Sequence, residues 1–175
     1  MRKLTTEEIV ESKGDLNKLK QKPKQDIYLI LDNIRSMYNV GAIFRTADAA
    51  GIKKLYLCGI TAAPPRKEIE KTALKTVDFV DWEHFSSTKE LVLKLKEKDV
   101  KIVALEQTEE SVNYHTFSYD KPLAIIIGHE TEGIDQEVLD LCDCSIEIPM
   151  HGIANSLNVA TAAGIILYKA TESNN

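Results

Sequence analysis

Short apolar runs alternate with longer amphipathic segments along most of this chain. The run at residues 123–127 is apolar at every position, and residues 27–31 are apolar except for one tyrosine. Continuous apolar runs of this length are typical of strands buried on both faces of a parallel sheet, whereas the segments between them have the period of helices. The alternation predicts an α/β fold, a parallel sheet covered by helices on both faces.

The same pattern gives approximate bounds for the elements. Strands are predicted at residues 27–31, 54–60, 77–82, 101–105, 123–127 and 146–148, of which 77–82 is the weakest. Helices are predicted at residues 40–50, closed by Gly51, and at 89–98, 134–141 and 157–170, with Ser86 or Ser87 capping the second. Residues 64–75 are expected to form a long, mobile connection. Because ligands of such sheets bind beyond the carboxyl ends of strands, the loops after residues 31, 105, 127 and 148 are the expected place for a site.

The length of 175 residues suits one compact domain and is too short for two. We expect residues 26–175 to form the domain and residues 1–25 to form an arm. The arm has seven basic and four acidic residues, so the net charge of −5 divides into +3 for the arm and −8 for the rest. The acidic total speaks against a uniformly basic nucleic-acid binder but allows a local basic patch. Two interpretations of the arm are equally favoured: a short solvated helix that begins near Thr6 and ends before Pro23, or a segment that contacts a nucleic acid.

Cysteine usage and hydropathy indicate the compartment. Cys58, Cys142 and Cys144 are odd in number, and the last two are one residue apart, which is poor geometry for a disulfide framework. No segment approaches the roughly 18 apolar residues of a membrane helix, and the polar N-terminus has no signal-peptide core. We expect a soluble, uncleaved, cytoplasmic protein that does not bind membranes.

Several familiar sites are excluded by their spacing. No G-x-G-x-x-G follows the first predicted strand, which speaks against a standard dinucleotide site. Gly128 and Gly133 have the separation of a P-loop, but Ile134 and Asp135 follow where lysine and serine or threonine are needed. The histidines at positions 84, 115, 129 and 151 are scattered, and no second histidine completes a zincin motif, so we predict no metal.

Three other segments carry side chains suited to chemistry. In residues 33–51, Asn39 is placed to cap the following helix through the amide of Ala42, and Gly41 allows close backbone packing. Arg45 lies in the second helical turn, where a surface pair with Asp48 would also explain it. Taken alone, this segment favours the surface pair with Asp48 as the explanation of Arg45.

The second and third segments surround two other predicted strand ends. In residues 123–134, Glu130 lies between two glycines and can fix an arginine or a substrate hydroxyl, although a plain strand-to-helix turn would look the same. In residues 146–164, a loop precedes Ser156 and Asn158 at the start of the last helix. There Ser156 can act simply as an N-cap, and Asn158 can simply face water.

In order and spacing, the three segments resemble the three motifs of the SPOUT superfamily of RNA methyltransferases, and within it the TrmH/SpoU family of 2'-O-ribose methyltransferases. The resemblance covers about residues 26–170. Strand order alone would predict an unknotted Rossmann-like sheet, because knots are almost absent from proteins. The resemblance implies instead a Rossmann-like sheet with a deep C-terminal trefoil knot. In it, the segments around Gly128 and residues 148–157 interpenetrate to form a pocket for S-adenosylmethionine.

The resemblance also implies roles for individual residues. The catalytic residues of the motifs fall on Asn39, Arg45, Glu130, Ser156 and Asn158. Cofactor contacts, largely from backbone groups, fall on Leu105, Glu106, Ile127, Gly128, Ile148, Met150 and Leu157. Family members are thought to use the motif-one arginine as a base, yet a guanidinium has a pKa above about 12 and stays charged. Arg45 is therefore expected to bind a phosphate or stabilise the developing alkoxide, while a phosphate oxygen or water takes the proton.

The activity implied is 2'-O-methylation of RNA by a homodimer whose active site the partner subunit completes. Because no large N-terminal substrate domain precedes the motifs, tRNA is the favoured substrate, with a guanosine of the D-loop as the candidate nucleotide. Alternatives are an rRNA methyltransferase, a non-catalytic RNA-binding or assembly factor with the same fold, and an α/β domain for another small ligand. Residues 2–24, 53–54 and 66–75 are expected to line one RNA-facing surface, with the acidic excess, for example Glu132, Asp135, Glu137 and Asp140, elsewhere.

Overall fold

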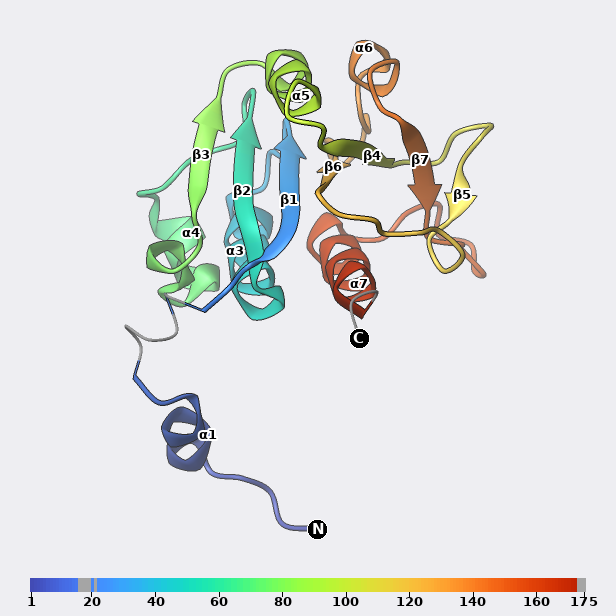
Figure 1. The fold of residues 1–175 in the computed structure, drawn as a ribbon. Coiled ribbons are helices and arrows are strands. Elements are labelled where there is room, and N and C mark those ends of the chain that lie inside the picture. The colour runs from blue at the N-terminus through green and yellow to red at the C-terminus, as the bar shows by residue number, and fades with distance from the viewer. Residues whose placement is uncertain (16–19, 21, 173–175) are drawn as a thin grey trace.

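In the computed structural model, which describes residues 1–15, 20 and 22–172, the strands form one parallel sheet (Figure 1). The strands are β1 (Gln25–Asp32), β2 (Ile52–Cys58), β3 (Trp82–Phe85), β4 (Lys101–Leu105), β5 (Val112–Asn113), β6 (Leu123–Ile127) and β7 (Cys144–Glu147). Their spatial order is β3-β2-β1-β6-β4-β7-β5, and each neighbouring pair is parallel. The predicted fold class is confirmed.

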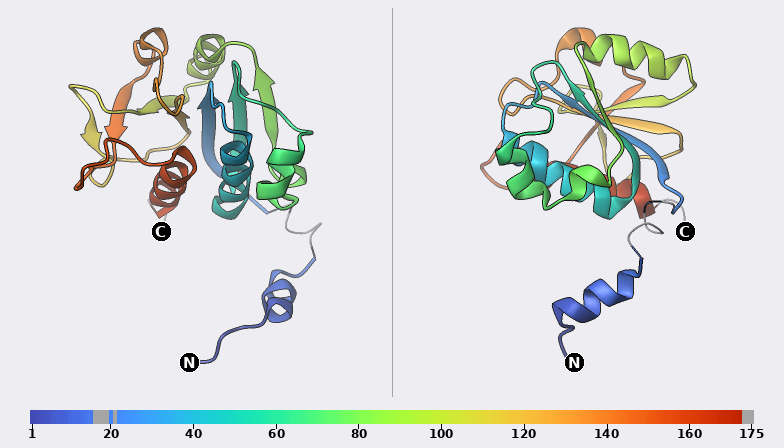
Figure 2. Two further views of the ribbon diagram at one scale, coloured as in Figure 1. Left: turned by 180° about the vertical axis from the view of Figure 1, so that it is seen from behind. Right: turned by 90° about the vertical axis from the view of Figure 1, so that its left-hand side faces the viewer.

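Helices cover both faces of the sheet. They are α1 (Thr6–Lys13), α3 (Met37–Ala50), α4 (Lys67–Ala73), α5 (Thr88–Lys96), α6 (Gln136–Leu139) and α7 (Val159–Glu172). Figure 2 shows α3, α4 and α7 on one side of the sheet and α5 and α6 on the other. Each side has its own apolar core, because side chains of β1 and β6 alternate between the two helical layers. This two-sided burial explains why β6 is apolar throughout, with no side chain more than 4% exposed.

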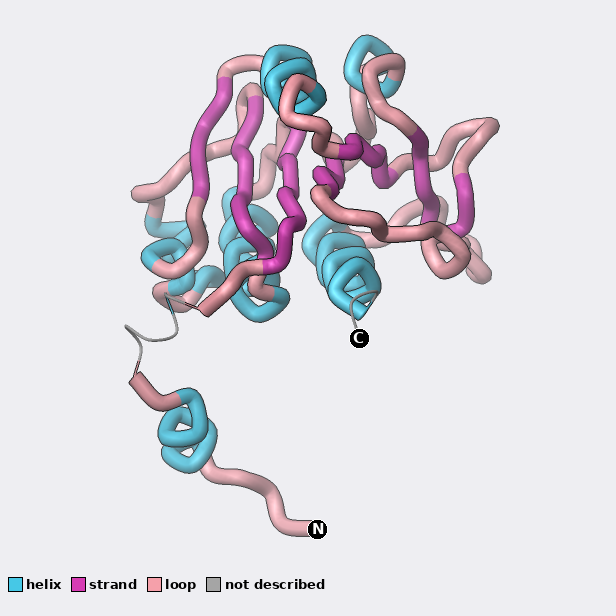
Figure 3. Tube along the Cα trace, viewed as in Figure 1, coloured by secondary structure: helices cyan, strands magenta, loops and turns pink. Residues whose placement is uncertain are grey.

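Two of the predicted elements are wrong. Residues 77–82 do not form a strand: a short 3₁₀ helix covers Thr76–Asp78, and β3 begins at Trp82. Lys75 before it has a φ of 71°, so the chain turns where the apolar pattern suggested extension. Residues 64–75 are not a structureless connection, because α4 forms there and buries Ile69 and Ala73 (Figure 3). The helix predicted at 134–141 is shorter, and the two-residue β5 was not predicted.

The close packing of α4 on α3 depends on Gly41. A Cβ at Gly41 would overlap Thr72 Oγ1 and the carbonyl oxygen of Ile69, so only glycine lets the two helices approach this far. Thr72 Oγ1 in turn donates a hydrogen bond of 2.9 Å to the carbonyl oxygen of Tyr38. The close packing expected at Gly41 is confirmed, and its partner is α4.

We predict that Gly41→Ala lowers the free energy of unfolding by about 1–3 kcal/mol, because the new methyl group must push α4 away from α3. The matched control is Gly164→Ala in α7, where the nearest atom, Thr46 Cγ2, would be 4.0 Å from the new Cβ. That control is expected to be neutral or to stabilise by up to about 1 kcal/mol, because alanine favours helix. Urea unfolding of both variants tests this; equal stabilities would contradict the packing argument.

The arm and the cysteines follow the expectations as far as they are described. Helix α1 begins at Thr6, is capped by Thr5 and buries no residue, and it lies apart from the sheet (Figure 1). Lys18 of the predicted basic arm lies outside the described residues.

The three cysteines are free, and burial raises the pKa of the Cys58 and Cys142 thiols to about 12. No described helix is long and apolar enough to cross a membrane. The division at residue 25 and the trefoil knot stay predictions.

Candidate active site

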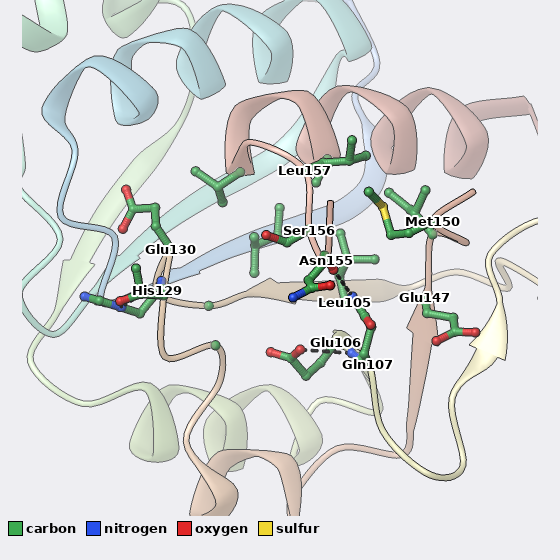
Figure 4. A pocket seen from close by; sticks show the side chains of 17 residues that line it. Leu105, Glu106, Gln107, His129, Glu130, Glu147, Met150, Asn155, Ser156 and Leu157 are labelled. Atoms are coloured by element: carbon green, nitrogen blue, oxygen red, sulfur yellow. Dashed lines mark hydrogen bonds between the residues drawn. The ribbon is translucent and has the colours of Figure 1, made fainter. Parts of the chain in front are cut away.

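A cavity of about 310 Å³ lies at the carboxyl ends of β4 and β6 (Figure 4). Loops that follow β4, β6 and β7 form its walls. All seven residues expected to contact the cofactor line it: Leu105, Glu106, Ile127, Gly128, Ile148, Met150 and Leu157. Glu130 and Ser156, from the expected catalytic set, line the same cavity. The structure therefore brings segments that are far apart in sequence to the predicted strand-end position.

The lining combines an apolar surface with a few polar groups. Leucine, isoleucine, methionine, valine and alanine side chains alternate with carboxylate, amide and hydroxyl groups. Pockets for small organic ligands have this composition, because apolar walls supply contact area and the few polar groups orient the ligand. The cavity volume is at the lower end of the 300–1,000 Å³ that is typical of such pockets. A small organic molecule is the kind of ligand that the cavity suits.

Glu106 holds the loop after β4 against the loop after β6. Its carboxylate accepts hydrogen bonds from the backbone N–H groups of Gln107 (2.9 Å) and Ile134 (3.1 Å). Gln107 Nε2 then donates to the carbonyl oxygen of Asn155 at 2.7 Å, which ties down the loop after β7. The roles of Gln107 and Asn155 were not predicted, and nothing in the local sequence signals them. These bonds fix the mutual position of the three pocket walls.

Gly128 is required because the chain folds back on itself after β6. A Cβ there would overlap the backbone of Gly133 and Ile134. The backbone N–H and carbonyl groups of His129 and Gly133 pair reciprocally at 3.0 and 2.9 Å. His129 Nδ1 also accepts from the N–H groups of Thr131 and Glu132, closing the loop. Gly128, which was expected to let a ligand approach the backbone, therefore lets the backbone of Gly133 and Ile134 pack against it. The resulting tight loop carries Glu130.

Glu130 binds the start of α3 through backbone groups. Its carboxylate accepts hydrogen bonds from the N–H groups of Arg35 and Ser36, both at 3.0 Å, and from Asn39 Nδ2 at 3.2 Å. Partial burial opposes ionisation of Glu130, but the hydrogen bonds outweigh it and hold the pKa of the carboxyl below its ordinary value. The carboxylate thus binds the main chain of Arg35 and Ser36. The expectation that it fixes a guanidinium or a substrate hydroxyl stays a prediction.

Asn39 joins Glu130 to the third motif segment. While its Nδ2 donates to Glu130, its Oδ1 accepts from Asn158 Nδ2 at 3.1 Å. The expected cap role of Asn39 is wrong, because Ser36 caps α3 and accepts from the Asn39 N–H at 3.3 Å. Nor does Ser156 cap α7: Asn158 Oδ1 accepts from the N–H groups of Ala160 and Thr161. One hydrogen-bonded chain, Glu130–Asn39–Asn158, therefore connects all three segments.

Ser156 and Arg45 remain outside this chain of hydrogen bonds. Ser156 is exposed and lines the cavity. Arg45 is exposed on α3, outside the cavity lining. Within the described residues it makes neither an ion pair nor a hydrogen bond, and the alternative pair with Asp48 does not form. Of the five expected catalytic residues, Glu130 and Ser156 thus line the cavity, Asn39 and Asn158 are joined to Glu130 by hydrogen bonds, and Arg45 lies apart from them.

The histidines, cysteines and carboxylates do not converge elsewhere. In the part of the chain that the structure describes, no group of three or more such side chains could hold a metal ion. The absence of a metal stays a prediction.

Comparison with known proteins places the whole domain among methyltransferases. A profile of the SpoU rRNA Methylase family matches residues 26–168. The chain is 35% identical over 156 residues to the tRNA (guanosine(18)-2'-O)-methyltransferase of Aquifex aeolicus, covering 89% of this chain and 73% of the relative. It is 31% identical over 145 residues to the Escherichia coli K12 protein of the same name, covering 83% of this chain and 62% of the relative.

Solved structures give the same result. The Aquifex aeolicus TrmH/SpoU tRNA modifying enzyme superposes with a TM-score of 0.81 at 33% identity, covering 94% of this chain and 84% of that one. The AdoMet-bound rRNA methyltransferase of Sinorhizobium meliloti superposes with a TM-score of 0.81 at 31% identity, covering 90% and 60%. The chain thus spans about three fifths of the Escherichia coli and Sinorhizobium proteins.

Proposed function

Because the chain belongs to the SpoU rRNA methylase family, we propose that it methylates the 2'-hydroxyl of a ribose in RNA. The observation that carries this proposal is the hydrogen-bonded chain Glu130–Asn39–Asn158, which joins the three motif segments beside one largely apolar cavity. A non-catalytic RNA-binding factor would have no need to keep these side chains together at a small-molecule pocket.

The cofactor of the proposed reaction is S-adenosylmethionine, which supplies an electrophilic methyl group. A relative at 31% identity carries AdoMet in its structure. The cavity of this chain suits such a molecule, because it combines apolar walls with the carboxylate of Glu106 and the exposed hydroxyl of Ser156. Leu105, Ile127, Gly128, Ile148, Met150 and Leu157 would form the remaining contacts.

The residues of the site act on the ribose by orientation and charge. The 2'-oxygen must lose its proton as it gains the methyl group. Holding this oxygen in line with the methyl group supplies much of the rate acceleration. The guanidinium of Arg45 is suited to bind a phosphate or to stabilise the developing alkoxide, and a phosphate oxygen or water accepts the proton. Asn39, Glu130 and Ser156 hold the ribose in position.

We further propose that two copies of the chain complete each other's sites. Arg45 is exposed and lies outside the cavity lining of its own chain, although the mechanism needs a cation at the ribose. A homodimer in which α3 of one protomer meets the cavity of its partner would supply this cation. Light scattering at micromolar concentration is expected to give the mass of a dimer; a monomer would contradict the proposal.

The proposed substrate is tRNA, with a guanosine of the D-loop as the candidate, because relatives from Aquifex and Escherichia coli are named for guanosine 18 of tRNA. rRNA is the second candidate, because the Sinorhizobium protein is an rRNA methyltransferase. A tRNA substrate, together with three free thiols, supports a cytoplasmic location.

The direct test is to incubate the protein with labelled S-adenosylmethionine and separate pools of unmodified tRNA and rRNA, and then to map 2'-O-methyl nucleosides by mass spectrometry. We expect one methylated guanosine in the tRNA pool. Methylation found only in the rRNA pool would show that rRNA, and not tRNA, is the substrate. Cofactor binding without any methylated nucleoside in either pool would overturn the enzymatic proposal.

A further inference from the structure

Tyr38 is an exposed aromatic residue directly beside the site. Its side chain is 50% exposed, although the neighbouring Val40 is fully buried in the core. The residue lies in the first turn of α3 and precedes Asn39, which binds Glu130. Its ring belongs to neither apolar core. The fold therefore gains no core packing from this ring.

Helix α4 binds the backbone of Tyr38 and sets a cation beside its ring. Thr72 Oγ1 donates to the carbonyl oxygen of Tyr38 at 2.9 Å, and Lys71 Nζ lies 5.9 Å from the centre of its ring. This distance is within the range of a cation–π contact. We call Arg35, Tyr38 and Lys71 the Tyr38 surface. It combines one exposed aromatic ring, the cation of Lys71 beside that ring, and the exposed Arg35, which directly precedes the N-cap of α3.

The cations on this side of the molecule are unpaired. Residues 33–51 and 64–75 contain six basic and three acidic residues. None of the six, which are Arg35, Arg45, Arg66, Lys67, Lys71 and Lys75, forms an ion pair within the described residues. An excess of unpaired positive charge attracts a polyanion, and the attraction falls with added salt.

Several cations elsewhere are neutralised by carboxylates. Lys53 pairs with Asp26 at 2.7 Å, and Lys54 pairs with Glu83 at 2.9 Å and with Asp81 at 3.7 Å. Lys89 and Lys96 likewise pair with Glu137 and Asp143 on the side covered by α5. The prediction that Lys53 and Lys54 belong to an RNA-facing surface therefore loses support. Within the described residues, the segments 33–51 and 64–75 thus carry a local excess of unpaired positive charge.

We propose that the Tyr38 surface binds an unpaired nucleotide next to the one that is methylated, with the base stacked on Tyr38 and phosphates bound by Lys71 and Arg35. Sequence-tolerant recognition of unpaired RNA uses this combination, because every base has a π face and every linkage has a phosphate. The inference rests on the proposed function, since it assigns a second RNA contact to the same site. It makes Tyr38 a substrate-positioning residue outside the cofactor cavity.

The test is the affinity of the protein for an unmodified tRNA transcript, measured by fluorescence anisotropy at several salt concentrations. Tyr38→Ala is expected to raise Kd about 10- to 100-fold, because loss of one base–aromatic stack is worth roughly 1–3 kcal/mol. Tyr38→Phe keeps the ring and should stay within about twofold of the wild type. Lys71→Ala should weaken binding and lower the salt slope by about one.

Tyr168→Ala is the matched control, because Tyr168 is 52% exposed on α7 and lies outside the Tyr38 surface. It should bind tRNA like the wild type. In methyl transfer, Tyr38→Ala should raise the KM for tRNA with a smaller effect on kcat, and calorimetry with S-adenosylmethionine should show unchanged cofactor affinity. Tyr38→Phe keeps the ring and removes only the hydroxyl group. Wild-type tRNA affinity in this variant would show that the ring, and not the hydroxyl group, is required.

The outcomes distinguish this inference from the proposed function. If the wild type methylates tRNA and Tyr38→Ala binds it equally well, this inference is wrong and the function stands. If the wild type binds the cofactor but neither binds nor methylates RNA, the proposed function itself fails. If Tyr38→Ala loses tRNA because it no longer dimerises in light scattering, Tyr38 is a contact between copies, and the inference is overturned.

Discussion

Replacing Glu130 with alanine is expected to lower the free energy of unfolding by about 2–4 kcal/mol and methyl transfer by at least about 100-fold. The carboxylate accepts three hydrogen bonds, from the N–H groups of Arg35 and Ser36 and from Asn39 Nδ2. Without it, the N–H groups of Arg35 and Ser36 lose their acceptor, and Asn39 keeps its side-chain hydrogen bond with Asn158 but loses the one with Glu130. Urea unfolding and incorporation of labelled methyl groups into tRNA measure the two effects.

Two further variants make this prediction specific. Glu130→Gln keeps one acceptor oxygen but turns an N–H₂ group toward donors, so it should be intermediate in stability. Glu132→Gln is the matched control, because Glu132 is an exposed carboxylate in the same loop whose side chain makes no hydrogen bond within the described chain. It should equal the wild type in both measurements. Equal losses in Glu132→Gln and Glu130→Gln would show that loop charge, and not the Glu130 contacts, matters.

The same contacts predict a dependence of stability on pH. The pKa of the folded-state Glu130 carboxyl lies below its ordinary value, which is near 4.5. Its contribution to stability is therefore complete above pH 4.5 and is lost as pH falls through the folded-state pKa. The stability difference between the wild type and Glu130→Gln should shrink below about pH 4.5. A difference that stays constant down to pH 3 would mean that ionisation of Glu130 is not coupled to folding.

Replacing Arg45 with alanine is expected to lower kcat by about 10²–10³-fold, which is the usual cost of losing one preorganised charge at a reacting oxygen. Stability and cofactor affinity should not change, because Arg45 is exposed and makes no ion pair within the described chain. Arg45→Lys keeps the charge without the planar fork, so activity near the wild type would indicate simple charge stabilisation. Lys98→Ala, an exposed cation elsewhere, is the control.

Mixing two inactive variants tests whether Arg45 acts on the partner subunit. In a heterodimer of Arg45→Ala and Glu130→Gln, one site would combine an intact Arg45 with an intact Glu130 from the other chain. We therefore expect activity to return when the two proteins are mixed and allowed to exchange subunits. If mixing restores nothing while light scattering proves exchange, Arg45 serves the cavity of its own chain.

The strands buried on both faces were the most predictable elements. β4 and β6 have the same bounds in the structure as in the prediction, because each lies between two other strands and two helical layers and is apolar for that reason. β3 lies at the edge of the sheet, and its sequence Trp82–Phe85 has only four residues, of which the two in the middle are polar. So short a signal did not stand out against the apolar residues before it.

Helix α4 shows why some local structure cannot be predicted locally. Its residues are mostly charged and follow two prolines, which favours a connection over a helix. The helix is stabilised by burial of Ile69 and Ala73 against α3, at the place where Gly41 leaves room for it. That contact exists only once both elements are packed on the sheet.

The sequence by itself determined the parallel α/β fold and the place of the cavity at strand ends, because apolar strands and the loops after them are local features. The resemblance of its motifs pointed to seven residues that line this cavity. Only the tertiary structure decided which side chains work together. Glu130 meets the start of α3 across more than 90 residues, and Asn158 meets Asn39 across 119. Such hydrogen bonds depend on where three strand ends meet in space, which no local stretch of sequence determines.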